Sequence, residues 1–343
     1  MKRLTGIDLI KTYAIIGVIM IHVSAEYILN SPVLSSDFSA ATVWRTFCAA
    51  SVPLFLMCSG ALLLRPEKEL TLKKLYFHNI LRLVIAMFVW AMLYKIFALF
   101  ISHSLDIANL WRVFKDVLTF DQEFHLYYIH VMLLVYAFLP ITRVFVKSAS
   151  EKTMRYALII WLLLGIVYPT AQYYWPFKLM HSVVPQWALN FCYCSIGYGV
   201  AGWYLMEKKL PTKIGCALAL FGALAIMLPT LFVSRSSGSA FINCLDANNI
   251  GVCALALGLF IMFLNVDIPA GKLNNCVRYV SKASFCIYLV HIFAHRILVQ
   301  HFGVLELGAS VYMVPLVTAV IFGLSLLAYL VLSHIPVVKD WTI

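Results

Sequence analysis

Four ionisable side chains interrupt an otherwise apolar stretch near the start of the chain, DLIKTYAIIGVIMIHVSAE (8–26). Lys11 and His22 are 11 positions apart, so on an α-helix they share one face, about 16 Å apart along the axis. Asp8 lies three residues before Lys11 and Glu26 four residues after His22, which extends the polar stripe in both directions. An imidazole and an ammonium placed in this way are suited to proton transfer or nucleophilic attack and to binding an anionic group.

The composition predicts that this stretch lies in a membrane. The chain has 343 residues, of which 63% are hydrophobic and only 12% are charged, whereas a soluble domain is nearer half apolar and a quarter charged. Apolar runs of about 20 residues, the length that spans a bilayer, fill almost the whole chain. They predict about ten spans, with approximate limits 7–29, 43–64, 79–101, 125–146, 155–174, 187–206, 213–233, 246–265, 283–302 and 310–333.

The connections between these runs alternate in charge. By count, about 17 Lys and Arg residues fall on the side of the termini and about five on the other side. The positive-inside rule then places both termini in the cytoplasm. The net charge of +11 is accounted for by these loops, so we expect no nucleic-acid partner. The sequence predicts an all-α, multi-pass membrane protein, a single domain over 1–343 with a retained first helix and no appended soluble domain.

Two interpretations of the first stripe are open at this point. Asp8 and Lys11 lie near the membrane surface, where a lysine can extend into water without any function. His22 lies deeper, and intramembrane ionisable groups normally face the protein interior or a water-filled cavity. We therefore expect a polar cleft beside the first helix.

Further polar groups recur in other spans. Ser59 and Gly60 end the second span, and Lys74, His78 and Arg82 are spaced i, i+4, i+8 at the cytoplasmic start of the third. A basic face there satisfies the positive-inside rule or holds phosphates, which favour Arg and Lys. His125 stands at the outer end of the fourth span. The ninth span places one set of residues on a single helical face: Ser284, Tyr288, His291 and His295.

Neither the histidines nor the cysteines predict a metal site. None of the nine cysteines forms a CxxC pair, and most lie in predicted spans, where cysteine behaves as a small apolar residue. The sequence shows no contact between helices that would bring the three histidines of the fourth and ninth spans together. We therefore expect no bound metal.

Taken in order, these elements resemble the acyltransferase 3 family, integral-membrane O-acyltransferases of bacteria. DLIK-x10-H (8–22) resembles the family's first-helix element, with Lys11 where arginine is usual. VPLFLMCSGALLL (52–64), HLYY (125–128) and SFCIYLVH (284–291) resemble its second, fourth and ninth segments. In the basic pair that opens the third segment, Arg82 matches the second member, while Asn79 stands at the first. The chain stops after its tenth span, as in the short, stand-alone members.

The resemblance implies a function and a set of site residues. The expected reaction moves an acetyl group from cytoplasmic acetyl-CoA, the co-substrate, to a hydroxyl of a surface glycan or its lipid-linked precursor, at the bacterial cytoplasmic membrane. His22 would act as general base or as acyl carrier, with Asp8 or Glu26 orienting it or Lys11. Lys11, Lys74 and Arg82 would hold the phosphates or pantetheine of CoA. The expected acceptor or oxyanion contacts are Ser59, His125, Tyr288 and His291.

A different class of function fits the same physics. About ten helices with buried charges and a transmembrane polar path also suit a transporter or flippase of a glycan or lipid precursor. Matched helix breaks in two halves would favour transport, and Pro140, Pro169, Pro229 and Pro315 form no matched pattern. A succinyl or longer acyl donor is a third alternative. Nothing in the sequence assigns the acceptor hydroxyl or the oligomeric state.

Overall fold

Helices make up most of the computed structural model, which describes residues 5–67 and 69–343 and has no β-strand in that part of the chain. The α-helices are α1 (Thr5–Asn30), α2 (Ser36–Cys48), α3 (Ser51–Leu63), α4 (Leu72–Lys74), α5 (Leu81–Ile101), α6 (Ile107–Leu118), α7 (Tyr127–Ser148), α8 (Glu151–Leu162), α9 (Tyr168–Ala171), α10 (Phe191–Lys208), α11 (Thr212–Ser237), α12 (Ile250–Leu264), α13 (Lys272–His295), α14 (Ser310–Leu332) and α15 (Pro336–Trp341). Three π-helical turns, η1 (Leu75–Ile80), η3 (Leu163–Val167) and η7 (Arg296–His301), continue α4, α8 and α13. The remaining elements are short 3₁₀ turns, η2 (Phe124–Leu126), η4 (Phe177–Leu179), η5 (Val184–Trp187), η6 (Asn243–Leu245) and η8 (Val304–Leu307).

The all-α membrane fold predicted from the sequence is confirmed. Within the described residues, nine helical segments are long and apolar enough to span a bilayer: Thr5–Asn30, Ser36–Leu63, Leu72–Ile101, Phe124–Ser148, Glu151–Ala171, Thr212–Ser237, Asn243–Leu264, Lys272–His301 and Ser310–Leu332. The remaining predicted span is α10, which is less apolar because tyrosines and glycines interrupt it. Much of α10 is buried against other helices, so it presents less surface to lipid.

The helix limits differ from the predicted ones where polar residues continue a helix past the apolar run. The third segment begins at Leu72 and the ninth at Lys272. No Gly or Pro lies between these residues and the apolar runs, so each helix is continuous into its span. The second segment begins at Ser36 and is interrupted at Ala49 and Ala50. The connection 102–124, expected to be a loop, contains the amphipathic helix α6.

Several helix starts are set by capping side chains. Ser35, Asp106, Ser150, Asn190 and Asn249 each accept a hydrogen bond from a backbone N–H two or three residues later, at the starts of α2, α6, α8, α10 and α12. Such caps satisfy N–H groups that have no partner within the helix. The starts of these five helices are therefore fixed by their own side chains.

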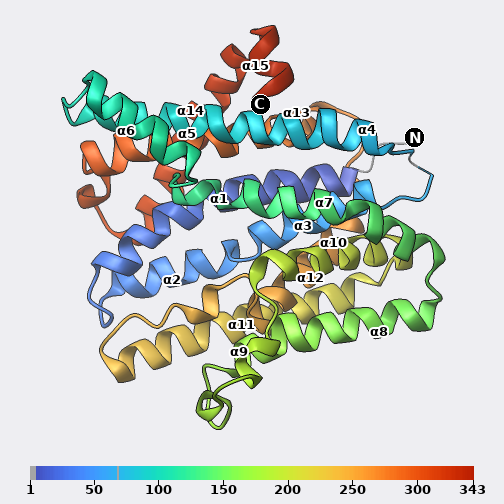
Figure 1. Ribbon diagram of the computed structural model, residues 1–343. Helices are drawn as coiled ribbons and strands as arrows, with labels where there is room; N and C mark the ends of the chain where they lie inside the picture. Colours follow the sequence, from blue (N-terminus) through green and yellow to red (C-terminus); the bar gives the residue numbers. More distant parts are fainter. Residues whose placement is uncertain (1–4, 68) are drawn as a thin grey trace.

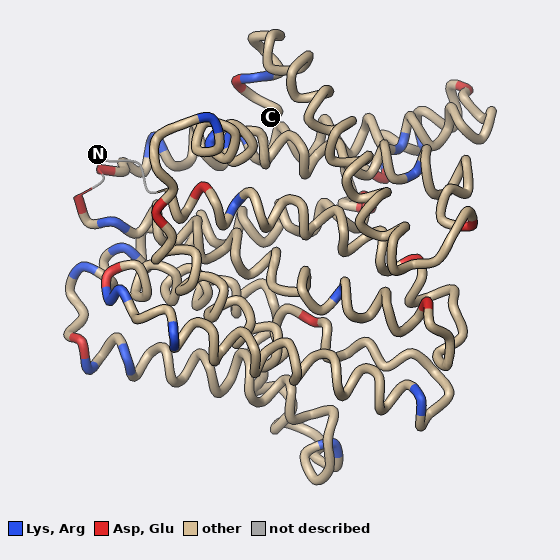
Figure 2. The backbone as a smooth tube through the Cα atoms, turned by 180° about the vertical axis from the view of Figure 1, so that it is seen from behind, with Lys and Arg blue, Asp and Glu red and all other residues tan. Residues whose placement is uncertain are grey.

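The first helix lies inside the bundle. Figure 1 shows α1 between the layer of α5 and α13 and the layer of α2, α3 and α12. It packs against α2, α3, α12, α13 and α14, and half of its residues are buried. Figure 2 shows the Lys and Arg residues gathered at the end of the bundle that holds the N-terminus. The positive-inside rule assigns that end to the cytoplasm; we call it the basic end.

Small residues bring the backbones of two helices together at the α3–α10 crossing. A Cβ added at Gly60 would lie 1.9 Å from the backbone oxygen of Gly199, and one added at Gly202 would lie 2.2 Å from that of Met57. Glycine at such positions permits the close approach that membrane helices use for packing. The Ser59-Gly60 pair therefore has a packing role as well as a place beside the site described below.

We predict that Gly60→Ala destabilises the fold, because the methyl group meets backbone atoms that cannot rotate away. Overpacking of this kind costs about 1–3 kcal/mol and occasionally more. Gly323→Ala in α14 is the matched control, since a Cβ there meets nothing within 4 Å. Thermal unfolding in detergent measures the stability of both variants. A thiol-reactive dye follows the unfolding by reporting the exposure of buried cysteines such as Cys58 and Cys253. Equal midpoints for the two variants would contradict the tight crossing.

Candidate active site

A cavity of about 750 Å³ lies beside α1, where the polar stripe predicts a cleft. Its walls come from α1, α2, α3, α5, α7 and α13, with contributions from η1, η2 and the segment before α12. Along α1 the lining extends from Lys11 through His22 to Ala25. The 14 residue steps from Lys11 to Ala25 cover about 21 Å of helix axis, about two thirds of a hydrocarbon core roughly 30 Å thick.

The two ends of the cavity carry different groups. Lys11, His78 and Arg82 line the part nearest the basic end. His22, Arg45 and Asp246 line the part nearest the opposite end, which we call the outer end. The cavity therefore joins a cationic inner region to an outer region that contains imidazole, guanidinium and carboxylate groups.

Four imidazoles gather around the outer half of α1. The ring centroid of His22 lies 5.2 Å from that of His291 and 6.3 Å from that of His295, and the His125 ring lies 5.8 Å from His291. His291 and His295 are one helical turn apart on α13, while His125 sits in η2 at the start of α7. The predicted face of the ninth span and the HLYY segment therefore meet at His22. His22 and His125 line the cavity, and His291 is fully buried behind them.

Hydrogen bonds fix this histidine cluster (His22, His125, His291 and His295). The Tyr288 hydroxyl donates to the backbone oxygen of His125 at 2.7 Å, and Nδ1 of His291 donates to that of Tyr288 at 2.6 Å. When the His291 ring is neutral, this bond leaves its Nε2 as an acceptor. Among the described residues, Nε2 of His291 and both ring nitrogens of His125 have no hydrogen-bond partner. These bonds therefore hold the His291 ring and the backbone of His125 in place while leaving ring nitrogen atoms of both residues available.

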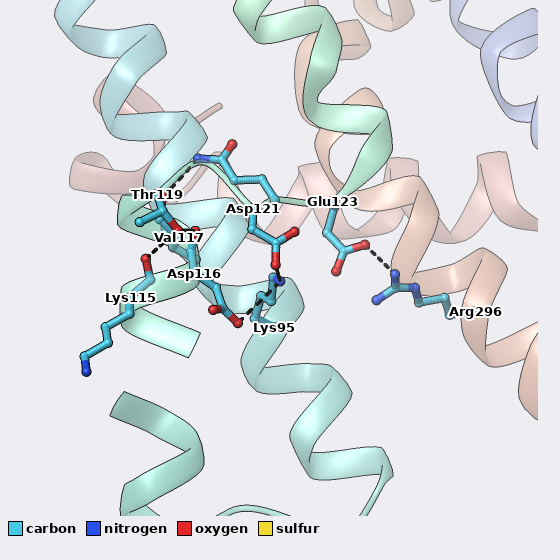
Figure 3. A network of polar contacts seen from close by, with 9 residues as sticks. Lys95, Lys115, Asp116, Val117, Thr119, Asp121, Glu123 and Arg296 are labelled. Carbon is cyan, nitrogen blue, oxygen red and sulfur yellow. Dashed lines mark hydrogen bonds and ion pairs between the residues drawn. The ribbon is translucent and has the colours of Figure 1, made fainter. Parts of the chain in front are cut away.

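Ion pairs secure the segment that carries His125. Glu123, which precedes η2, pairs with Arg296 at the end of α13, and Lys95 of α5 pairs with Asp116 and Asp121 at 3.8 and 3.2 Å. Figure 3 shows the two sets of contacts side by side. Glu123 lies two residues before His125, and Arg296 directly follows His295. Their ion pair therefore sets the spacing between η2 and α13.

Asp8 and Glu26, predicted to orient His22 or Lys11, lie outside the cavity lining. The buried carboxylate of Asp8 accepts a 2.6 Å hydrogen bond from Ser281, which joins α1 to α13. Glu26 Oε1 lies 3.8 Å from Nε2 of His295, and its other oxygen accepts from Asn30 at 3.4 Å. Both carboxylates therefore act on the α1–α13 contact, and Glu26 is placed beside the histidine cluster through His295.

The predicted basic face of the third segment is only partly directed into the cavity. His78, Asn79 and Arg82 line it, whereas Lys74 does not. The i, i+4, i+8 spacing assumes an α-helix, but the chain forms the π-helical turn η1 over these residues. A π-helix bonds i to i+5 and changes the register, and such turns often occur at functional sites. Arg82 also donates a hydrogen bond to the backbone oxygen of Ile343, and its Nε is buried without a partner among the described residues.

Ser59 and Tyr288 line the cavity as the sequence predicts. The Ser59 hydroxyl donates to the backbone oxygen of Phe55 at 2.9 Å, so its oxygen remains an acceptor. The Tyr288 hydroxyl proton is already used on His125. Tyr288 thus positions His125 in this structure rather than offering an oxyanion donor.

The cavity wall also contains Arg45 and Asp246, which were not among the predicted site residues. Arg45 falls inside the predicted second span, where a charged residue is costly and marks a functional position. Its place in that span could therefore have identified Arg45 as a candidate site residue from the sequence. Asp246 lies just after η6, and no spacing pattern relates it to α1 or α2.

In the parts of the chain that the structure describes, no group of three or more His, Cys, Asp or Glu side chains is arranged to hold a metal ion.

Comparison with known families agrees with the arrangement of the segments. The acyltransferase 3 family model, described as an acyltransferase domain, matches residues 4–334. No curated protein and no solved structure matched the chain significantly. The match covers nearly the whole chain, including every helix that lines the cavity. The protein therefore belongs to the acyltransferase 3 family and is a membrane acyltransferase.

Proposed function

We propose that the protein transfers an acetyl group from cytoplasmic acetyl-CoA to a hydroxyl of a cell-surface glycan or its lipid-linked precursor, in the cytoplasmic membrane of a bacterium. One observation carries this proposal: a single cavity joins a cationic region near the basic end to His22 near the outer end. A donor from inside and an acceptor from outside have to meet across the bilayer. The cavity provides a common space for both.

The inner region suits the donor. Lys11, His78 and Arg82 offer positive charge or N–H donors to phosphate groups, and the buried Nε of Arg82 lacks a partner among the described residues. Arginine binds phosphate through a fork of N–H groups, and lysine binds it as a point charge. Lys11 stands where the family's arginine is usual, and it would bind a phosphate as a point charge. The CoA thioester supplies the activated acyl group.

The outer region suits proton transfer at the acceptor. The His22 imidazole takes the proton of the acceptor hydroxyl as the hydroxyl oxygen forms a bond to the acyl carbon. The carbon–sulfur bond then breaks, and the proton passes from the imidazolium to the departing thiolate. His291 and His295 hold the His22 ring by contact, and Glu26 lies behind His295.

A covalent route uses the same residue. The His22 nitrogen would attack the thioester carbon, release the thiol and carry the acyl group to the acceptor as an acyl-imidazole. Rapid acid quenching of the protein with radiolabelled acetyl-CoA distinguishes the routes. Label bound to the wild-type protein and missing in His22→Gln supports the covalent route, whereas unlabelled protein during turnover supports the general-base route.

The proposal is tested with protein reconstituted in lipid nanodiscs. Radiolabelled acetyl-CoA should bind and be slowly hydrolysed, since water replaces the acceptor. If folded wild-type protein neither binds nor hydrolyses acetyl-CoA, the proposed donor is wrong. Parallel assays with succinyl-CoA and a long-chain acyl-CoA test the other donors. Transport of a glycan or lipid without acyl transfer, the alternative from sequence, is disfavoured by the family to which the chain belongs.

We predict that Arg82→Gln raises KM for acetyl-CoA about 10-fold or more, because it removes a charge-assisted hydrogen bond to phosphate. The same variant should change KM for acetyl-pantetheine little, since that donor lacks the phosphates. Lys74→Gln is the control, as Lys74 is exposed and lies outside the cavity. A similar loss with both donors would assign Arg82 to the contact with Ile343 rather than to CoA.

A further inference from the structure

Arg45 lies at the depth of the histidine cluster. It is nine residues after the start of α2, and His22 is eight residues before the end of α1. By the helical rise, both side chains leave the backbone about 12–14 Å from the outer ends of their helices. Helices α1 and α2 pack together, and both residues line the same cavity. Arg45 therefore faces the space beside His22.

The Arg45 guanidinium has Asp246, Cys48 and Tyr127 as electrostatic neighbours, but its buried Nη1 has no hydrogen-bond partner among the described residues. A buried guanidinium nitrogen that donates no hydrogen bond is costly. Arg45 also lines the cavity. A bound ligand could accept the hydrogen bond that Nη1 lacks.

A carboxylate lines the same cavity near Arg45. Asp246 lines the outer end of the cavity but is more exposed than Arg45. In the described part of the chain, Arg45 and Asp246 form no ion pair within 4.0 Å. Two opposite charges that line one cavity without closing on each other leave room for a ligand that bonds to both.

Aromatic side chains form the adjoining wall. Phe124, Tyr127 and Tyr128, from η2 and the start of α7, line the cavity next to His125. Aromatic rings contribute large apolar faces, and tyrosine adds a polar tip. A wall of this kind, beside separated donors and acceptors, suits a ligand with an apolar face and hydroxyls at its edge.

We propose that Arg45 and Asp246 bind the acceptor as a neutral pyranose through neighbouring hydroxyls, beside the aromatic wall of Phe124, Tyr127 and Tyr128. This inference rests on the proposed function and names the class of its acceptor. A hydroxyl both donates and accepts, so neighbouring hydroxyls can accept from the Arg45 guanidinium and donate to the Asp246 carboxylate. A sugar that carries a carboxylate would satisfy Arg45 but would be repelled by Asp246 at the mouth of the cavity.

Two soluble acceptors of the same shape test the charge argument. Methyl glucoside is neutral, and methyl glucuronide replaces its hydroxymethyl group with a carboxylate. The assay measures transfer from radiolabelled acetyl-CoA to each sugar by wild-type protein, Arg45→Gln and Asp246→Asn in phosphatidylcholine nanodiscs. Asp267→Asn is the carboxylate control, because Asp267 is exposed between α12 and α13 and lies outside the cavity.

We expect wild type to favour methyl glucoside about 10-fold or more in kcat/KM. Asp246→Asn should lower kcat/KM for methyl glucoside, raise it for methyl glucuronide, and leave KM for acetyl-CoA unchanged. Arg45→Gln should raise KM for both sugars about 10-fold or more, since the lost hydrogen bonds involve a charged donor. Asp267→Asn should match wild type.

The inference fails if wild type hydrolyses acetyl-CoA but acetylates neither sugar, if it favours the glucuronide, or if Asp246→Asn leaves the ratio unchanged. Failure of the proposed function is recognised separately, as absence of acetyl-CoA binding and hydrolysis. In that case equilibrium dialysis of radiolabelled methyl glucoside decides the inference. Binding retained in Asp267→Asn and lost in Asp246→Asn supports the sugar site, and equal binding by the two variants overturns it.

Discussion

His22→Gln is expected to lower acetyl transfer at least about 100-fold while leaving acetyl-CoA affinity unchanged. Glutamine can hydrogen-bond but cannot take up and return a proton, and general acid–base groups contribute about 10²–10⁴-fold in rate. The donor groups Lys11, His78 and Arg82 line the other end of the cavity, so binding should survive the substitution. The initial rate with radiolabelled acetyl-CoA and its binding by equilibrium dialysis measure the two effects.

The control for this prediction is His334→Gln. His334 is exposed beyond the end of α14, and its ring contacts the backbone oxygen of Leu330. It should retain full activity. A wild-type rate in His22→Gln would show that His22 does not take part in the reaction. His125, which also lines the cavity, would then be the candidate base. Loss of donor binding in His22→Gln would instead indicate a role in binding.

Glu123→Gln is expected to lower both stability and activity, because it leaves Arg296 without its partner. The side chains of this pair are only 12% and 22% exposed, and breaking a buried ion pair costs about 3–5 kcal/mol. Partial exposure of Arg296 places our expectation near 3 kcal/mol, at the lower end of that range. The same change frees η2, so His125 should lose its fixed position beside His291 and the rate should fall.

The matched control is Glu151→Gln at the surface. Glu151 pairs with Arg155 and Lys208, all with well-exposed side chains, and such pairs contribute little. Removing both charges in Glu123→Gln/Arg296→Gln should recover part of the lost stability, since no charge then remains unpaired. The thiol-reactive unfolding assay supplies the measurement. If Glu123→Gln unfolds like Glu151→Gln, the ion pair does not hold η2 against α13.

The sequence by itself predicted the class of protein, the positions of the membrane segments and one face of the first helix. These depend on apolar run length and on the 3.6-residue period, which are local properties of the chain. Lys11 and His22 share the cavity for that reason, and Tyr288 and His291 share one side of α13. The predicted resemblance to the acyltransferase 3 family is confirmed by the family match over residues 4–334.

Predictions that assumed an uninterrupted α-helix were less accurate. The π-helical turn η1 brings His78 and Arg82 to the cavity and leaves Lys74 outside. Hydrophobic pattern does not distinguish a π-turn from an α-turn within one apolar segment. The outer segment 107–118 was missed as a helix because it is amphipathic and shorter than a span.

Only the tertiary structure decided which polar groups meet. His22, His125, His291 and His295 come from three segments, and Arg45 and Asp246 come from two more. Their proximity depends on how the helices rotate and cross, which small residues such as Gly60 and Gly199 control through close backbone contact. Helical period determines the face on which a side chain lies, but the packing of neighbouring helices determines what that face meets.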